Sequence, residues 1–522
     1  MKPRWVKWLA LAFAVLAAPS DLRAETDFAA RLQELIAGLD YDEARGALAT
    51  ANLDDPQVAL ERARLAVYEL DCDGAAAIFG RPELQSFELG EQLANIARGC
   101  QRVTAALAVD RDEERGVEVR WQDEHDRALA PLIFDTVVRA RDALTRDLGV
   151  DWPRPTRIVV VRDLLSLSAM TGLPYKSAQT TGTVAVAKWG RITLLSPRAS
   201  RHGYAWRDTL AHELTHLAVT RASRDRASLW LQEGVAKHEE VRWRDPGPFD
   251  ERPSAEAIVQ RGQEQKLAIP LDRLGPSIAM LPSADQATVA FAEVTSFVRF
   301  YVETAGADAL PRLLAELKAG KQPDQALVAA SGANLKEWDA KWRAYVASKP
   351  REPTPPLFSP ESKHREIDAW TEVRNRTRLA ELLLARGHAT EALDELDPIF
   401  VRKPPAVDHA LDSVTSDPNI RWLRARALEG AGRRQDGEGL VADPKEALSS
   451  YAPWWALRGR WARLRGDEVL ATASFIEAIA ADPFDVEAAC ESTGDAAAGA
   501  AAAETPLCDA ARAADTPPFG ED

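Results

Sequence analysis

The stretch TLAHELTHLAV, residues 209–219, decides how this chain is interpreted. It places His212, Glu213 and His216 in a run whose other residues are mostly apolar. If the run is a helix, the two histidines lie on one face and can direct two imidazole nitrogens to the same metal ion. Glu213 then lies beside the first imidazole, within reach of a water molecule at the metal. The alternative is an ordinary packed helix that carries two histidines.

A catalytic zinc site normally has three protein ligands and keeps one position open for water. The stretch SLWLQEGVAKHEE, residues 228–240, is predicted to form a second helix, and it carries Glu233. A tryptophan and a leucine at its start can bury this helix against the first. A helix pair of this length can return a carboxylate to the two imidazoles. The sequence therefore predicts a zinc site formed by His212, His216 and Glu233.

Composition and charge limit the class of protein. With 522 residues, 46% of them hydrophobic and 28% charged, the chain is typical of a globular protein with about two to four domains. This composition does not suggest disorder or a protein with many membrane spans. The formal net charge of −15 repels phosphate backbones, so no nucleic-acid partner is expected.

The first 24 residues are typical of an export signal, with basic residues, then an apolar run over 8–18, then a small residue at Ala24. The run is too short to cross a bilayer comfortably, so cleavage near Ala24 is favoured over an uncleaved anchor. We expect a periplasmic or secreted protein with no stable membrane span after cleavage.

The four cysteines fall into two local pairs, Cys72 with Cys100 and Cys490 with Cys508. In an oxidising compartment we expect a disulfide within each pair, and free buried thiols are the alternative. The chain has no Cys-x-x-Cys motif, so neither thiol redox chemistry nor a cysteine zinc ribbon is indicated.

Apolar periodicity predicts helices throughout residues 27–110. Runs rich in β-branched residues predict strands over 116–121, 156–163 and 182–197. Further helices are predicted over 128–148, 206–222, 228–242, 291–303 and 307–320, with a connection over 245–282. Five prolines in residues 348–363 indicate an extended spacer.

The C-terminal part carries the spacing of a tetratricopeptide (TPR) repeat, in which small residues let paired helices approach closely. The first set of matching positions is Ala380, Gly387, Ala392 and Leu396, and the second is Trp455, Gly459, Ala471, Phe475, Ala478 and Pro483. Generic helical hairpins are the alternative interpretation.

GRITLLSP, LAHELTHLAV, LWLQEGVAKHEE and the helical stretches that follow them resemble the peptidase MA-like domain, a gluzincin metallopeptidase group related to thermolysin. The resemblance covers about residues 116–346. It implies an α+β fold with a thermolysin-like zinc peptidase core, a mixed β-sheet plus helices, flanked here by TPR-like helical regions. It also implies that TVAVAKWGRITLL, residues 183–195, supplies an antiparallel edge strand that aligns a peptide substrate.

The resemblance also implies the roles of individual residues. The zinc ligands of the family match His212, His216 and Glu233, and its general base matches Glu213. The implied reaction is hydrolysis of a peptide bond by a zinc-activated water, with Zn²⁺ as cofactor.

Two positions depart from the family pattern. Similar domains often have a tyrosine that donates to the oxyanion where this chain has Phe291. The residues available as substitutes are Tyr204, His202, His238 and Tyr301. An acid that orients a ligating histidine is expected one turn after Glu233, where this chain has Lys237. The acids available instead are Asp208, Glu239, Glu240 and Glu293. Each of these residues could equally be an ordinary packed or surface residue.

We therefore divide the chain into a signal peptide (1–24), an N-terminal TPR-like helical region (25–112), a peptidase MA-like catalytic domain (113–347), a Pro-rich linker (348–368), and a C-terminal TPR-like domain with an Ala-rich tail (369–522). The expected function is that of an exported zinc metallopeptidase, acting on a protein or peptide, whose TPR-like regions bind a protein partner. The main alternative is a peptidase-like scaffold with little or no turnover that binds proteins. A zinc-assisted hydrolase of another substrate is a third hypothesis.

Overall fold

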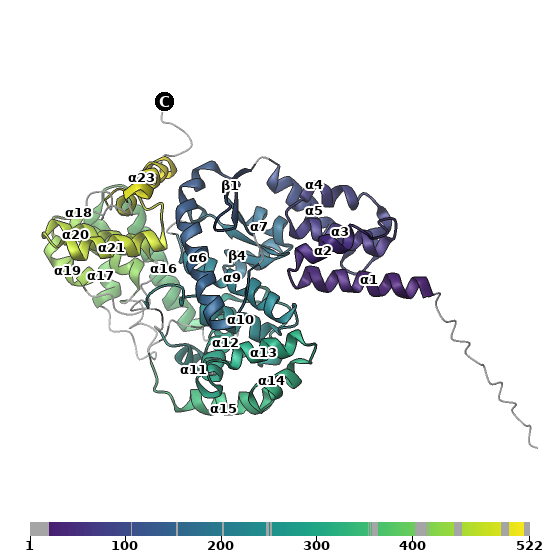
Figure 1. The fold of residues 1–522 in the computed structure, drawn as a ribbon. Helices are drawn as coiled ribbons and strands as arrows, with labels where there is room; N and C mark the ends of the chain where they lie inside the picture. The colour runs from purple at the N-terminus through teal and green to yellow at the C-terminus, as the bar shows by residue number, and fades with distance from the viewer. Residues whose placement is uncertain are drawn as a thin grey trace, which may run out of the picture.

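The computed structural model describes residues 20–105, 107–152, 155–200, 203–246, 250, 253–352, 354, 357, 364–401, 415, 417–442, 451–491 and 501–515. Residues 1–19 of the predicted signal peptide and much of the proline-rich segment 348–363 lie outside these residues. A group of N-terminal helices, a sheet covered by helices, and a second group of helices follow one another along the chain (Figure 1). Within the described ranges, no helix is long and apolar enough to cross a membrane.

The centre of the fold is a mixed sheet in the order β1-β2-β3-β5-β4. Its strands are β1 (Ala108–Asp112), β2 (Val117–Trp121), β3 (Thr156–Val161), β4 (Ala185–Lys188) and β5 (Arg191–Leu195). The β1/β2 and β4/β5 pairs are antiparallel, and β3 lies parallel to both β2 and β5. With helices around this mixed sheet, the predicted α+β class is confirmed, and β4 forms one edge of the sheet.

Two predictions about the strands were wrong. The segment 182–197, predicted as one strand, folds into a β4–β5 hairpin because Trp189 and Gly190 both have positive φ, 57° and 67°, as a two-residue type I′ turn requires. The segment predicted to be helical up to residue 110 ends earlier, because β1 pairs with β2 from Ala108 onward. Its short alternation of half-buried and exposed residues is the period of an edge strand.

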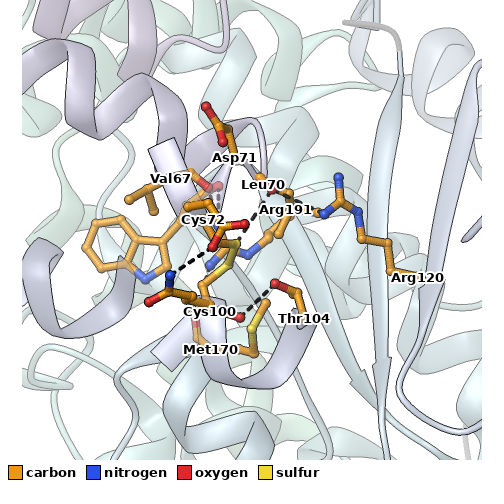
Figure 2. The surroundings of a disulfide bond; sticks show 12 residues. Val67, Leu70, Asp71, Cys72, Cys100, Thr104, Arg120, Met170 and Arg191 are labelled. Atoms are coloured by element: carbon orange, nitrogen blue, oxygen red, sulfur yellow. Dashed lines mark hydrogen bonds between the residues drawn. A yellow bond between two sulfur atoms is a disulfide. The ribbon is translucent and has the colours of Figure 1, made fainter. Parts of the chain in front are cut away.

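The N-terminal helices pack against the β4–β5 hairpin. They are α1 (Ser20–Ala37), α2 (Tyr41–Leu48), α3 (Pro56–Tyr68), α4 (Cys72–Ile78), the short 3₁₀ helix η1 (Pro82–Ser86) and α5 (Gly90–Thr104). The predicted Cys72–Cys100 disulfide is present and joins α4 to α5 (Figure 2). Beside it, the fully buried Arg191 guanidinium donates to the carbonyls of Val67 and Met170 (Figure 2). The start of β5 is therefore bonded to the N-terminal helices.

Gly190 provides a test of this junction. A Cβ at Gly190 would collide with the Tyr41 hydroxyl and the Tyr68 ring, whereas at Gly182, also at positive φ, it would meet open space. Gly182→Ala should lower the free energy of unfolding by about 1–2 kcal/mol because of its backbone conformation alone. Gly190→Ala should lower it by about 1–3 kcal/mol more because of overpacking. Urea unfolding of both variants measures the difference, and equal losses would show that the junction is loose.

The helices around the sheet carry the site. They are η2 (Glu124–Leu129), α6 (Ala130–Leu148), α7 (Leu164–Thr171), α8 (Tyr175–Thr181), η3 (Pro197–Ala199), α9 (Trp206–Ser223), α10 (Leu229–Glu239), α11 (Ala255–Glu264), η4 (Leu271–Arg273), η5 (Ile278–Met280), α12 (Ala284–Ala305), α13 (Ala309–Lys318), α14 (Pro323–Ser331) and α15 (Leu335–Ser348). Helix α11 lies in the predicted connection 245–282, where no helix was expected. Gly234 brings α10 close to α12, because a Cβ there would collide with Val298. This close contact between α10 and α12 holds in place the helix that carries Glu233.

The C-terminal helices form antiparallel hairpins, among them one that the sequence patterns did not reveal, α18 with α19. The helices are α16 (His364–Ala385), α17 (Ala389–Val401), α18 (Pro418–Gly430), α19 (Arg434–Ala442), α20 (Ala452–Leu464), α21 (Glu468–Ala481), α22 (Val486–Glu491) and α23 (Ala501–Asp515). The predicted Cys490–Cys508 disulfide joins α22 to α23. The assignment of these hairpins as TPR repeats stays a prediction.

The C-terminal helices also contact the chain just before α9. The Tyr204 N–H donates to the carbonyl of Ala481 at 2.8 Å, and the Arg198 guanidinium lies over the Phe484 ring. Phe484 belongs to the same buried core as the sheet. The end of α21 is therefore packed directly against the segment that leads into α9.

Candidate metal centre

Helices α9 and α10 bring the predicted ligands together. On α9, ligand atoms of His212, Glu213 and His216 all lie within 4.8 Å of one another. On α10, Glu233 turns toward the imidazoles, and its Oε2 lies 3.6 Å from His212 Nε2 and 3.5 Å from His216 Nε2. The two Nε2 atoms are 3.2 Å apart. Three ligand atoms from two helices thus form a nearly equilateral triangle.

The size of this triangle fits a zinc ion. Tetrahedral ligands at about 2.0–2.1 Å from zinc are roughly 3.3–3.4 Å from one another. The three distances between His212, His216 and Glu233, 3.2–3.6 Å, scatter around that value. Two imidazole nitrogens and one carboxylate oxygen are also ligands that zinc prefers, and this set leaves a fourth position for water or substrate.

The electrostatics of this triangle favour a cation. Burial alone would raise the pKa of Glu233, but the charges and hydrogen bonds of His216 and His212 outweigh it and lower the pKa. Burial alone would lower the pKa of His212, but Glu233 and Glu240 outweigh it and raise the pKa to about 10. The carboxylates therefore make the pocket strongly attractive to positive charge, whether it comes as protons or as a metal ion.

Glu213 lies beside the ligand triangle and also contacts the edge of the sheet. Its carboxylate accepts a hydrogen bond from the Ala187 N–H of the edge strand β4. Burial raises the pKa of Glu213, which suits a group that must take up a proton. Nothing in the sequence pointed to Ala187, because this contact depends on how β4 lies over α9.

Each imidazole is held at its second nitrogen by a polar side chain from the α10 region. His212 Nδ1 lies 3.0 Å from Glu240 Oε2, and His216 Nδ1 lies 3.2 Å from Gln232 Oε1. Such partners fix which ring nitrogen faces the metal. Gln232 was missed by the sequence analysis, although its place directly before Glu233, on a helix facing α9, was the available signal.

Of the four acids proposed to orient a histidine, Glu240 is the one that contacts His212. Asp208 accepts from Trp243 and Arg244, and Glu239 lies toward Arg242. The buried carboxyl of Glu293 accepts from the Ile269 N–H. The remaining three acids therefore have other partners.

Phe291 lies at the site, where the family pattern led us to expect a donor. Its ring packs edge-on against His212, with centroids 6.4 Å apart, and it offers no hydrogen bond. Among the described substitutes, Tyr204 is the one whose pKa is affected by a residue of the site. Burial and the nearby Glu213 carboxylate raise the pKa of Tyr204, and its hydroxyl donates to the carbonyl of Leu195.

Tyr301 and His238 have partners other than the candidate metal ligands. Tyr301 is fully buried against Trp338, and His238, whose pKa burial lowers to about 4, lies near Arg242. His202 lies outside the described residues. Neither Tyr301 nor His238 is therefore a candidate oxyanion donor.

Comparison with known families gives a match over the segment that contains these residues. Residues 139–348 match the peptidase MA superfamily. This segment is a peptidase MA-like domain. It begins within α6 and ends with α15, and so includes β3, β4, β5 and both helices of the candidate metal centre. No curated protein and no solved structure matches the chain.

Proposed function

We propose that this protein is an exported zinc-dependent metallopeptidase. The observation that carries the proposal is the triangle of His212 Nε2, His216 Nε2 and Glu233 Oε2, whose sides match tetrahedral zinc coordination. These three residues would hold the ion. A bound zinc ion would supply Lewis acidity, which lowers the pKa of water and polarises a carbonyl group.

The protein's own residues then carry the proton transfers. Glu213 would accept a proton from the attacking water, since its carboxylate stands beside the triangle and burial raises its pKa. The same group would return the proton to the departing amine. The Ala187 N–H holds the carboxylate in this place.

The substrate would be an extended peptide. Among the described residues β4 is an edge strand with β5 as its neighbour, and the Ala187 N–H points from its other side toward Glu213. An extended chain can add to such an edge through main-chain hydrogen bonds. This would place a peptide carbonyl above the ligand triangle.

Export and partner binding belong to the same proposal. Disulfides persist in oxidising compartments, and Cys72–Cys100 and Cys490–Cys508 support a periplasmic or secreted location. The C-terminal hairpins would bind a protein partner or the substrate, as TPR-like repeats do.

One observation favours a different function, a zinc-holding scaffold that binds proteins but has little turnover. Phe291 packs against His212, and its ring cannot donate a hydrogen bond to an oxyanion. The two functions make the same prediction for zinc content and opposite predictions for hydrolysis.

Removal of the metal distinguishes the peptidase from the scaffold. The mature protein should contain about one zinc per chain and cleave unfolded casein. Treatment with a chelator should reduce cleavage to background, and added zinc should restore it. Metal analysis and gel assays provide the measurement. Zinc binding without cleavage of casein or other unfolded proteins would favour the scaffold, and a chain that binds no zinc would contradict both functions.

A further inference from the structure

We propose that Lys237 is a positioning residue for the metal centre and acts through Glu240. The proposal rests on the proposed zinc-dependent function and adds to it a residue that does not touch the ligand triangle. Lys237 stands one helical turn after Glu233, on the same helix α10.

The geometry is a chain of three side chains. Lys237 Nζ lies 2.6 Å from Glu240 Oε2, and that same oxygen lies 3.0 Å from His212 Nδ1. The Lys237 ammonium and the His212 ring thus meet at one carboxylate oxygen. The other ring nitrogen of His212 is the one that faces Glu233.

The place of Glu240 explains why a second contact is needed. It follows the last residue of α10, and its carboxylate stands at the end of a flexible side chain. A carboxylate can direct His212 only if it stays in one position, because the hydrogen bond at Nδ1 fixes which nitrogen is free for the metal. The ion pair with Lys237 supplies that restraint.

The Lys237–Glu240 pair is partly exposed to solvent. Its loss should therefore affect zinc affinity without a large change in the stability of the fold. The side chains of Lys237 and Glu240 are 30% and 21% exposed. Ion pairs that reach solvent contribute little to stability. Loss of Lys237 should therefore change the orientation of His212 more than the stability of the fold.

The test is a double-mutant cycle on the purified full chain, with the zinc Kd measured by competition with a chelator. Glu240→Gln should weaken zinc binding by about 10- to 100-fold, the usual effect of losing a partner of a ligating histidine. Lys237→Met should weaken it by about 10-fold, and should have no further effect when Glu240→Gln is already present, because the two act in one network. Lys237→Arg, which keeps the positive charge, should keep a zinc Kd close to that of the wild type.

Lys321 provides a matched control, because it also pairs with a glutamate. It lies on the connection between α13 and α14, and its partner Glu316 lies on α13. Lys321→Met should leave the zinc Kd unchanged, and all variants should keep the melting temperature of the zinc-free protein. Wild-type zinc affinity in Lys237→Met, or independent effects of Lys237 and Glu240 in the cycle, would overturn the proposal and leave the proposed function intact. A wild-type chain without zinc affinity would overturn both.

Discussion

Glu213→Gln is expected to lower kcat for peptide hydrolysis by about 10²- to 10⁴-fold, the usual contribution of a general base. Glutamine keeps the size of the side chain and a carbonyl oxygen that can accept from the Ala187 N–H. It cannot take up the proton of the attacking water. Because Glu213 is not part of the ligand triangle, the zinc content should stay the same.

The measurement is steady-state hydrolysis of a fluorogenic peptide, with zinc quantified in the same samples. Glu264→Gln is the control, because this exposed carboxylate on α11 pairs with Arg261 and Arg351. It should retain wild-type activity. If Glu213→Gln kept full activity with one bound zinc, another residue would have to be the base.

Glu233→Ala is expected to weaken zinc binding by more than about 100-fold, beyond the effect of losing a mere partner of a ligand. The substitution removes one corner of the triangle and the negative charge between the two imidazoles. Zinc at a concentration 100-fold above the wild-type Kd should stabilise the wild-type protein by about 2.7 kcal/mol. Most of this stabilisation should be lost in the variant. Thermal unfolding with and without zinc measures it.

Glu239→Gln is the matched control on the same helix. Burial, and after it Asp147, raise the pKa of Glu239 to about 8, so at pH 7 its carboxyl is mostly protonated and glutamine is a close mimic. Glu239 lies toward Arg242 rather than the imidazoles. Zinc should stabilise this variant as it does the wild type. Equal zinc stabilisation of Glu233→Ala and Glu239→Gln would remove Glu233 from the ligand set.

The departures from the family pattern show where sequence reasoning was limited. Lys237 stands where an acid was expected, and the four acids considered instead could not be ranked from the sequence. In the structure Glu240 reaches His212 from beyond the end of α10, while Lys237 contacts the same carboxylate. Whether the Glu240 side chain reaches His212 depends on the path of the backbone at the end of α10. The apolar periodicity of the sequence does not give that path.

The strands illustrate the same limit. The β-branched run 182–197 correctly indicated extended chain, but the turn at Trp189 and Gly190 was not recognised because tryptophan is unusual at positive φ. This position is tolerated because the Trp189 ring is buried against Tyr68. Tertiary packing thus decided a local conformation that residue preferences opposed.

The sequence alone determined the features that depend on short-range geometry. The spacing of His212 and His216 fixes both on one helical face, and the closeness of each cysteine pair along the chain favoured the two disulfides. Only the tertiary structure decided that Glu233 turns toward the imidazoles, that Glu240 supports His212, and that β4 presents Ala187 to Glu213. The physical reason is that helix geometry repeats every few residues, whereas the approach of two helices and a strand depends on the sum of many weak contacts between distant residues.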